Sequence, residues 1–217
     1  MVTVSLILLI LLLPSVLLMA IMSEKEMRIR LFFFALGFIA AYESGQINAL
    51  VFSSGAMFES DVTINIAPAV EEFLKGLPLV LYLFVCRPGK RIVCEYAVWT
   101  GIGFALFENA WAFYRSVGES PDLSDIMFAL SRGFGASMIH SLCTLILISG
   151  ICLCMKHRKL VITGSIAMFS FVCVIHSMFN VLIDSKYTAA PFILTIGVYV
   201  LMFFIYRAKK KADTTQA

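Results

Sequence analysis

The chain has 217 residues, of which 60% are hydrophobic and only 14% are charged, and its mean hydropathy is +0.93. A soluble domain carries about 25% charged residues. This composition therefore excludes an ordinary soluble protein and indicates an integral membrane protein. The net charge of +3 comes from basic loop residues, and the sequence gives no indication of a nucleic-acid-binding surface.

Seven apolar stretches are long enough to cross a bilayer, for which an α-helix needs about 20 residues. In chain order they cover residues 2–22, 31–51, 63–86, 92–114, 127–155, 160–183 and 189–206. The first has no basic residue before its apolar run, unlike a secretion signal, so we interpret it as a retained helix. The sequence predicts an all-α, polytopic membrane bundle of about seven transmembrane helices, forming a single domain over residues 1–217.

Basic residues fall in alternate loops of this predicted bundle. Thirteen of the 17 follow the first, third, fifth and seventh helices: Lys25, Arg28, Arg30, Arg87, Lys90, Arg91, Lys156, Arg158, Lys159, Arg207, Lys209, Lys210 and Lys211. Basic loops stay on the cytoplasmic side of a membrane. We therefore predict a multi-pass protein of the plasma membrane, with its amino terminus outside and its carboxy terminus cytoplasmic.

Three ionisable residues interrupt the predicted helix 63–86. Glu71, Glu72 and Lys75 would each cost roughly 2.5–3.5 kcal/mol at the middle of a bilayer. Their spacing puts Lys75 within reach of either glutamate along one helix. One glutamate can then be held ionised while the other, about 100° round the helix, faces a different partner. Ionisable residues inside a membrane helix usually mark an ion pathway or a catalytic site.

Polar residues of four predicted helices lie at one depth. Counted from the basic residues at the helix ends, Glu72, Glu108, His140 and His176 all lie about 22–26 Å from the cytoplasmic anchors, at 1.5 Å per residue. In a hydrocarbon core about 30 Å thick, this is the outer half. We predict that these residues converge in one buried polar site nearer the exterior than the cytosol.

Four motifs follow one another in these helices. They are Glu71-Glu72-Phe-Leu-Lys75, then Phe104 with Glu108-Asn109, then Arg132 with His140, and finally His176-Ser-Met-Phe-Asn180. In this order and spacing the chain resembles the PrsW family of intramembrane proteases over roughly residues 65–185. It is similar, more distantly, to the CAAX prenyl endopeptidases and the Abi proteins.

The resemblance implies a glutamate-dependent endopeptidase that cuts other membrane proteins. In the PrsW family the known role is the first cut in an anti-sigma factor, on the extracytoplasmic side, during regulated intramembrane proteolysis in bacteria. The implied partner is a single-span membrane protein such as an anti-sigma factor, within the lipid bilayer. The implied side of cleavage agrees with the depth counted from the basic residues.

Peptide hydrolysis needs an activated water, stabilisation of the oxyanion and a proton for the leaving amine. We predict that Glu71 or Glu72, together with Glu108, positions and deprotonates the water. His140 is a candidate proton donor or water ligand.

The remaining candidates have supporting roles. His176 and Asn180 share a helical face, and we predict that they donate hydrogen bonds to the oxyanion. Lys75 and Arg132 are expected to hold the carboxylates in place. Arg132 is equally compatible with a position at the membrane interface.

A metal is a second version of the same site. Two histidines and one or two glutamates are sufficient ligands for zinc, and the ligands would be Glu72, Glu108, His140 and His176. The chain lacks HExxH or a comparable two-ligand helix. We therefore predict a site without a cofactor, with zinc as the alternative.

Two other classes of protein fit the bare chemistry. Acids, imidazoles and a lysine at one depth also occur in proton-coupled transporters. The absence of a visible inverted repeat in the sequence is unlike most secondary transporters. A non-catalytic membrane scaffold that keeps the fold without turnover is the third class.

Overall fold

The structure is a computed structural model, which describes residues 27–55, 57–116, 123–184, 196–197 and 199–200. Within these residues the elements are α2 (Met27–Ser53), α3 (Glu59–Asp61), the π-helical segment η1 (Val62–Ile66), α4 (Ala67–Cys86), α5 (Lys90–Ser116), α6 (Leu123–Cys154), the short 3₁₀ segment η2 (Arg158–Leu160) and α7 (Val161–Asp184). This part of the chain contains no strand. The predicted all-α class is confirmed for the described residues.

Five predicted helices correspond to helices of the structure, with differences at their ends. The stretch 31–51 begins four residues earlier, as α2, and 63–86 is divided into η1 and α4. The stretches 92–114, 127–155 and 160–183 correspond to α5, α6 and α7. The predicted helix 2–22 lies outside the described residues, and 189–206 lies almost wholly outside them.

Two of the described helices, Asp125–Cys154 and Val161–Ile183, are long and apolar enough to cross a membrane by length and composition. The helix α4 has a span's length, but Glu71, Glu72 and Lys75 interrupt its apolar sequence. The seven-helix topology and the orientation of the termini stay predictions.

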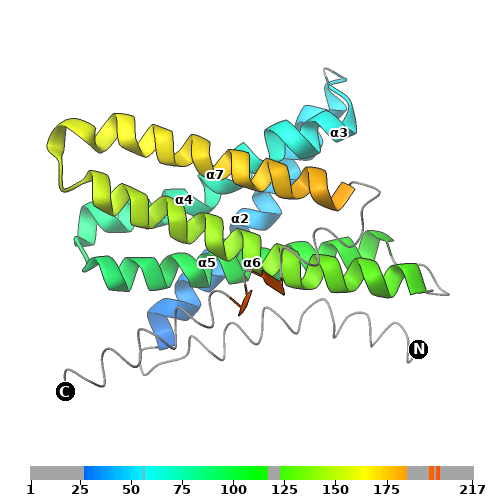
Figure 1. Cartoon of the computed structure of the whole chain (residues 1–217), viewed down its shortest axis with the longest axis horizontal. Coiled ribbons are helices and arrows are strands. Elements are labelled where there is room, and N and C mark those ends of the chain that lie inside the picture. The colour runs from blue at the N-terminus through cyan, green and yellow to red at the C-terminus, as the bar shows by residue number, and fades with distance from the viewer. Residues whose placement is uncertain (1–26, 56, 117–122, 185–195, 198, 201–217) are drawn as a thin grey trace.

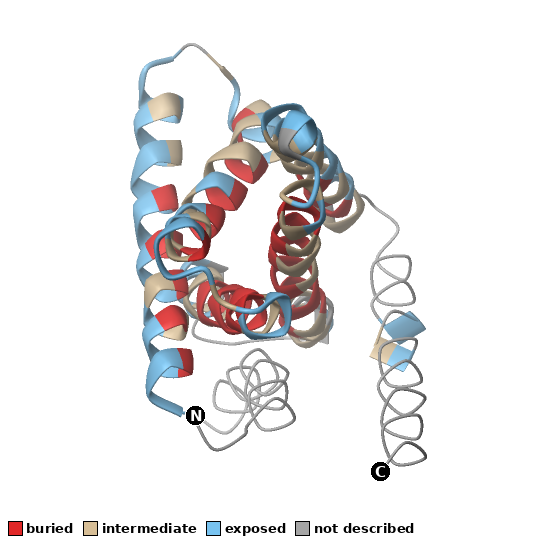
Figure 2. Ribbon diagram, turned by 90° about the vertical axis from the view of Figure 1, so that its left-hand side faces the viewer, coloured by how far each residue is buried: buried red, intermediate tan, exposed pale blue. Residues whose placement is uncertain are grey.

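Four helices, α4 to α7, run side by side, and α2 crosses one side of them (Figure 1). Viewed nearly along these four helices, their buried faces turn toward one another and their exposed faces turn outward (Figure 2). Each of the five helices contributes to one apolar core, through residues that include Phe33, Leu79, Tyr96, Ile148 and Val172. Many large hydrophobic side chains, such as Phe32, Leu81 and Ile162, are exposed on the outer surface. Such a surface suits contact with lipid.

Glycines let three of these helices approach closely. A Cβ at Gly101 of α5 would lie 2.5 Å from Ser141 Cα and 2.7 Å from the His140 carbonyl oxygen of α6. On the other side of α5, a Cβ at Gly103 would overlap the Phe34 carbonyl of α2. Small residues allow such backbone contact between membrane helices. The close approach fixes α5 against α6 at the level of His140.

One basic residue lies elsewhere than predicted. Arg30 was expected in a loop, but it belongs to α2 and is buried. Its guanidinium forms an ion pair with Glu95 of α5. This ion pair, together with the packing of Phe33, holds the first described turns of α2 in the bundle.

Candidate functional site

Four helices bring their ionisable side chains into one connected cluster. The cluster comprises Glu71, Glu72 and Lys75 of α4, Glu108 of α5, Arg132 and His140 of α6, and His176 of α7. The predicted convergence of these residues is therefore present in the structure. Their catalytic roles stay predictions, as does their depth in a membrane.

Lys75 lies at the centre of the cluster and is fully buried. Its Nζ donates to Glu72 Oε1 at 2.6 Å and lies 3.0 Å from His140 Nδ1. An ammonium group can only donate hydrogen bonds, so Nδ1 of His140 is the acceptor. Lys75 thus joins two helices, and it also lies 4.7 Å from the ring centroid of Phe104.

Glu108 is held on both of its oxygens. Arg132 Nη2 donates to Oε1 at 2.5 Å, and His140 Nε2 hydrogen-bonds Oε2. Because Nδ1 of His140 accepts from Lys75, Nε2 carries the hydrogen and donates to Glu108. The Glu108 side chain is 28% exposed, whereas that of Glu72 is completely buried. Glu108 is therefore the carboxylate of the cluster most open to the surroundings.

His176 has the opposite arrangement of its two ring nitrogens. Its Nδ1 lies 2.8 Å from Glu72 Oε1, and because a carboxylate accepts, Nδ1 donates. The Nε2 atom is then left with its lone pair and lies 3.6 Å from Glu71 Oε2. Among the described residues, the buried Glu71 Oε2 has no hydrogen-bond partner. A lone pair and an unpaired carboxylate oxygen thus face each other inside the protein.

Glu71, His140 and His176 together form a group that fits a metal ion. Each offers one ligand atom, and these atoms lie within 4.8 Å of one another. Two histidines and one glutamate with an open fourth position are a ligand set of catalytic zinc. A histidine ligand usually donates its other ring nitrogen to a carboxylate, as His176 does to Glu72.

Two of the four predicted zinc ligands, Glu72 and Glu108, are not in this group, and Glu71, which was not among the predicted ligands, is in it. Glu72 was expected as a ligand but is not part of the three-residue group. Its Oε1 accepts from Lys75 and His176, and its buried Oε2 has no hydrogen-bond partner among the described residues. Glu71 occupies the position facing His176 instead. Glu108 was also expected and lies beside His140, but it is not part of the three-residue group.

The amide nitrogen of Asn180 contacts η1 and not the cluster. Its Nδ2 donates to the Thr63 carbonyl oxygen of η1 at 3.1 Å. The predicted oxyanion role of Asn180 stays a prediction.

No role was predicted from the sequence for the aromatic residue Phe104. Its ring packs on that of His140, with ring centroids 4.6 Å apart. The sequence indicated this position, because Phe104 lies four residues before Glu108 and therefore on the same face of the helix.

An all-α bundle that combines apolar helices with a buried cluster of carboxylates and imidazoles is typical of a membrane protein with an ion pathway or a catalytic site. The model of the PrsW family intramembrane metalloprotease matches residues 25–208, so the chain belongs to this family. The resemblance seen in the sequence is confirmed, and the match extends beyond residues 65–185 at both ends. A search of curated proteins and a search of solved structures found no match.

Membership of this family indicates an intramembrane peptidase that acts on membrane proteins in a lipid bilayer. It also bears on the cofactor. The prediction of a site without a cofactor is not supported, because the family is described as a metalloprotease and the Glu71, His140 and His176 group fits a metal. The alternative prediction, a possible zinc ion, is the one supported.

Proposed function

We propose that this protein is an endopeptidase that hydrolyses a single-span membrane protein near the extracytoplasmic face of the plasma membrane. The substrate class we propose is an anti-sigma factor, cut at the first step of regulated intramembrane proteolysis in a bacterial cell. The multi-pass arrangement with the amino terminus outside is part of this proposal. Family membership supports the peptidase activity, and the choice of substrate rests on the resemblance of the motifs.

The observation that carries the proposal is that two buried acceptors, Glu71 Oε2 and His176 Nε2, face each other without a donor between them. These two acceptors face each other at 3.6 Å, and the carboxylate oxygen has no donor among the described residues. A buried acceptor without a partner is unfavourable by about 1–3 kcal/mol. A water molecule or a cation bound there would satisfy both atoms.

The charge of the cluster supports the same conclusion. Three carboxylates, those of Glu71, Glu72 and Glu108, are accompanied by two basic groups, Lys75 and Arg132. One negative charge is left over if all three carboxylates are ionised and both histidines are neutral. Because an uncompensated buried charge is costly, the site favours a bound proton or a metal ion.

Glu71, His140 and His176 are the residues that would hold the metal. To serve as a ligand, His140 would have to give up one of its two contacts, with Lys75 at Nδ1 or with Glu108 at Nε2. A zinc ion bound by them would act as a Lewis acid and lower the pKa of a bound water. Glu71 and His176 hold and orient the reacting water in this proposal. Glu72 keeps the Nε2 of His176 free by accepting from Nδ1.

Glu108 has the role of proton carrier. As the most open carboxylate of the cluster, it takes the proton from the water and returns it to the leaving amine, as general acid–base catalysis requires. Arg132 and His140 orient its two oxygens. Lys75 is completely buried, so it acts by fixing Glu72 and His140 and does not contact substrate.

The experiment is co-expression with candidate single-span membrane proteins, followed by mapping of any new amino terminus. The variants are Glu71→Gln, Glu108→Gln and the control Glu43→Gln, an exposed glutamate of α2. We expect wild type and the control to cut near the outer membrane face and the two site variants to lose the cut. A cut in the cytosolic part of the substrate, or full activity of Glu71→Gln, would refute the proposal.

Metal analysis of the purified protein tests the cofactor separately. We expect about one zinc per chain in wild type and its loss in His176→Ala, because that variant removes one of three ligands. Cleavage that persists in a metal-free preparation would leave the peptidase in place and refute the metal.

A further inference from the structure

The chain changes its helical register immediately before the glutamates of α4. The segment η1 is π-helical, and the amide of Ala67 donates to the Val62 carbonyl, five residues earlier. Such wide turns are rare and frequently occur at functional sites. Here the wide turn ends five residues before Glu71, so its geometry sets where α4 begins.

Pro68 creates a gap in the wide turn, because proline has no amide hydrogen to donate. In the register of η1, residue 68 would donate to the Thr63 carbonyl, which it cannot do. The preceding amide, that of Ala67, already donates to Val62. The Thr63 carbonyl therefore receives no hydrogen bond from the turn that follows it.

The side chain of Asn180 fills this gap. Its Nδ2 donates to the Thr63 carbonyl oxygen at 3.1 Å. A carbonyl can only accept, so the contact requires the amide nitrogen of Asn180. A side-chain donor from α7 thus replaces the backbone donor that Pro68 lacks.

The same face of α7 contacts α4 one turn earlier. His176, four residues before Asn180, hydrogen-bonds Glu72 and lies near Glu71. Helix α7 therefore holds the start of α4 at three places. Asn180 contacts the wide turn, Cys173 Sγ lies 3.9 Å from the Pro68 carbonyl oxygen, and His176 contacts the glutamates. If the Asn180 contact is lost, η1 is free to change register, and the glutamates that follow it move.

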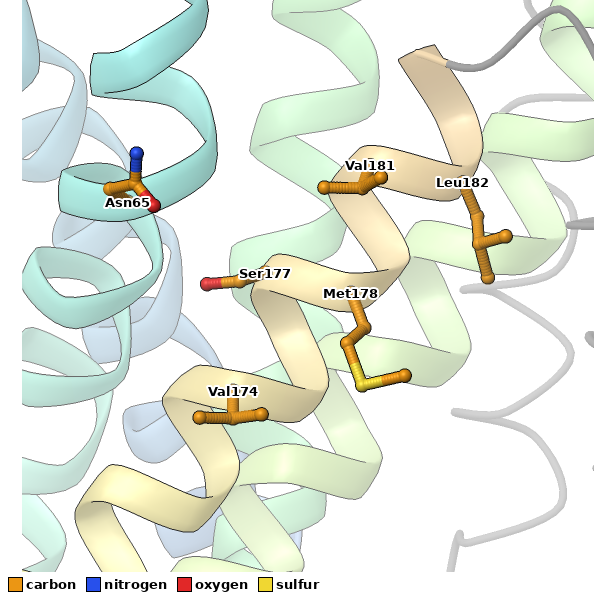
Figure 3. A pocket seen from close by; sticks show the side chains of 6 residues that line it. All are labelled: Asn65, Val174, Ser177, Met178, Val181 and Leu182. Atoms are coloured by element: carbon orange, nitrogen blue, oxygen red, sulfur yellow. The ribbon is translucent and has the colours of Figure 1, made fainter.

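A groove between η1 and α7 makes the hydrogen bond of Asn180 to Thr63 more important for holding these two segments together. The groove measures about 430 Å³ and lies between η1 and α7, lined by Asn65, Val174, Ser177, Met178, Val181 and Leu182 (Figure 3). On this side the side chains of η1 and α7 leave a space between them. The hydrogen bond of Asn180 therefore accounts for a larger part of the attachment of η1 to α7 than it would in a close-packed contact.

We infer that Asn180 is a positioning residue, which replaces the missing donor of Pro68 at Thr63 and so fixes the start of α4 and the place of Glu71 and Glu72. This role differs from donation to an oxyanion, because it acts through the backbone of η1. The reaction that it serves rests on the proposed function. The contact itself does not depend on it.

The test is a rescue experiment in the full-length protein. Asn180→Leu keeps a side chain of similar size and removes the donor, and Pro68→Ala restores a backbone amide next to the orphan carbonyl. We expect Asn180→Leu to increase hydrogen exchange over residues 62–69 by about tenfold, as loss of one hydrogen bond implies. The double variant Pro68→Ala/Asn180→Leu should return exchange close to the wild-type rate.

Cleavage kinetics provide the second readout. Displaced catalytic groups lower turnover by about 10–100-fold, so we expect Asn180→Leu to lose kcat in this range with little change in KM. The double variant should recover kcat. If Asn180 instead donated to the oxyanion, Pro68→Ala would not restore activity. Failure of the rescue would therefore overturn the inference.

The controls separate this inference from the proposed function. Pro68→Ala alone should behave as wild type in both measurements. If Asn180→Leu does not fold, judged by size-exclusion chromatography in detergent, Asn180→Asp removes the donor with a smaller change in shape and carries the same expectation. If hydrogen exchange over residues 62–69 is unchanged in Asn180→Leu or, where that variant does not fold, in Asn180→Asp, the inference is overturned. A wild-type protein that cuts nothing overturns the proposed function and leaves the exchange result to decide the role of Asn180.

Discussion

The replacement of Lys75 by methionine is the most informative single change, because Lys75 joins α4 to α6 from a fully buried position. Methionine fills a similar volume without the charge. The Glu72 carboxylate would then keep His176 as a donor and lose the ammonium that lies 2.6 Å from its Oε1.

The magnitude follows from the burial of both partners. Neither the Lys75 nor the Glu72 side chain is exposed, and removal of one partner from a buried ion pair costs about 3–5 kcal/mol. For a chain of this size, 1 kcal/mol corresponds to about 2–4 °C in Tm. We therefore expect Lys75→Met to lower Tm by about 6–20 °C.

The assay is thermal unfolding in detergent, with two companion variants. The double variant Lys75→Met/Glu72→Gln removes both charges, and the carbonyl oxygen of the new side-chain amide would still accept from His176. We expect it to recover most of the lost stability but no cleavage activity. The matched control is Arg115→Met, which breaks an exposed pair with Glu59 at 3.9 Å. Exposed pairs contribute about 0–1 kcal/mol, so this control should change Tm little.

Two results would refute this reasoning. If Lys75→Met melts within about 2 °C of wild type, less than 1 kcal/mol has been lost and the buried pair does not stabilise the fold. If the double variant is no more stable than Lys75→Met, the loss comes from packing of the lysine stem and not from an unpaired carboxylate.

Three further predictions test the surroundings of the cluster. Gly101→Ala should destabilise the protein by about 1–3 kcal/mol, because the new Cβ would overlap the His140 carbonyl. Its control is Gly45→Ala, whose Cβ would meet nothing within 4 Å and which should not lower Tm. Arg132→Gln should reduce kcat by about 10–100-fold, because Glu108 loses one of its two donors; unchanged turnover would remove Arg132 from the mechanism. Chelation of the purified protein should lower both activity and Tm, and added zinc should restore both.

The helices were predictable because hydrophobic length is the dominant signal in a membrane protein. The stretches 92–114, 127–155 and 160–183 agree with α5, α6 and α7 to within a few residues. The position of Arg30 inside α2 was not predictable, since a basic residue beside an apolar stretch is typical of a loop. Its burial depends on Glu95, 65 residues later in the chain. A tertiary ion pair of this kind leaves no local pattern.

The members of the cluster were predictable from their common depth, but their partners were not. Counting residues along a helix gives the depth of a side chain in the membrane. It does not give the rotation of the helix about its own axis, which decides which neighbour the side chain faces. The sequence therefore left Glu71 and Glu72 equivalent. The structure distinguishes them, since Glu72 accepts from Lys75 and Glu71 faces His176 Nε2. The partner of Asn180 was also out of reach, because it depends on the register of η1.

The backbone contact between α2 and α5 has a consequence for how a substrate reaches the cluster. A Cβ at Gly37 would overlap the Thr100 carbonyl, and one at Gly103 would overlap the Phe34 carbonyl. Two ordinary helices pack with their axes about 8–10 Å apart, and this seam is closed by main-chain atoms. A transmembrane segment cannot enter laterally between α2 and α5 unless these two helices separate. For the membrane-protein substrate of the proposed function, the seam between α2 and α5 is therefore not an entry route.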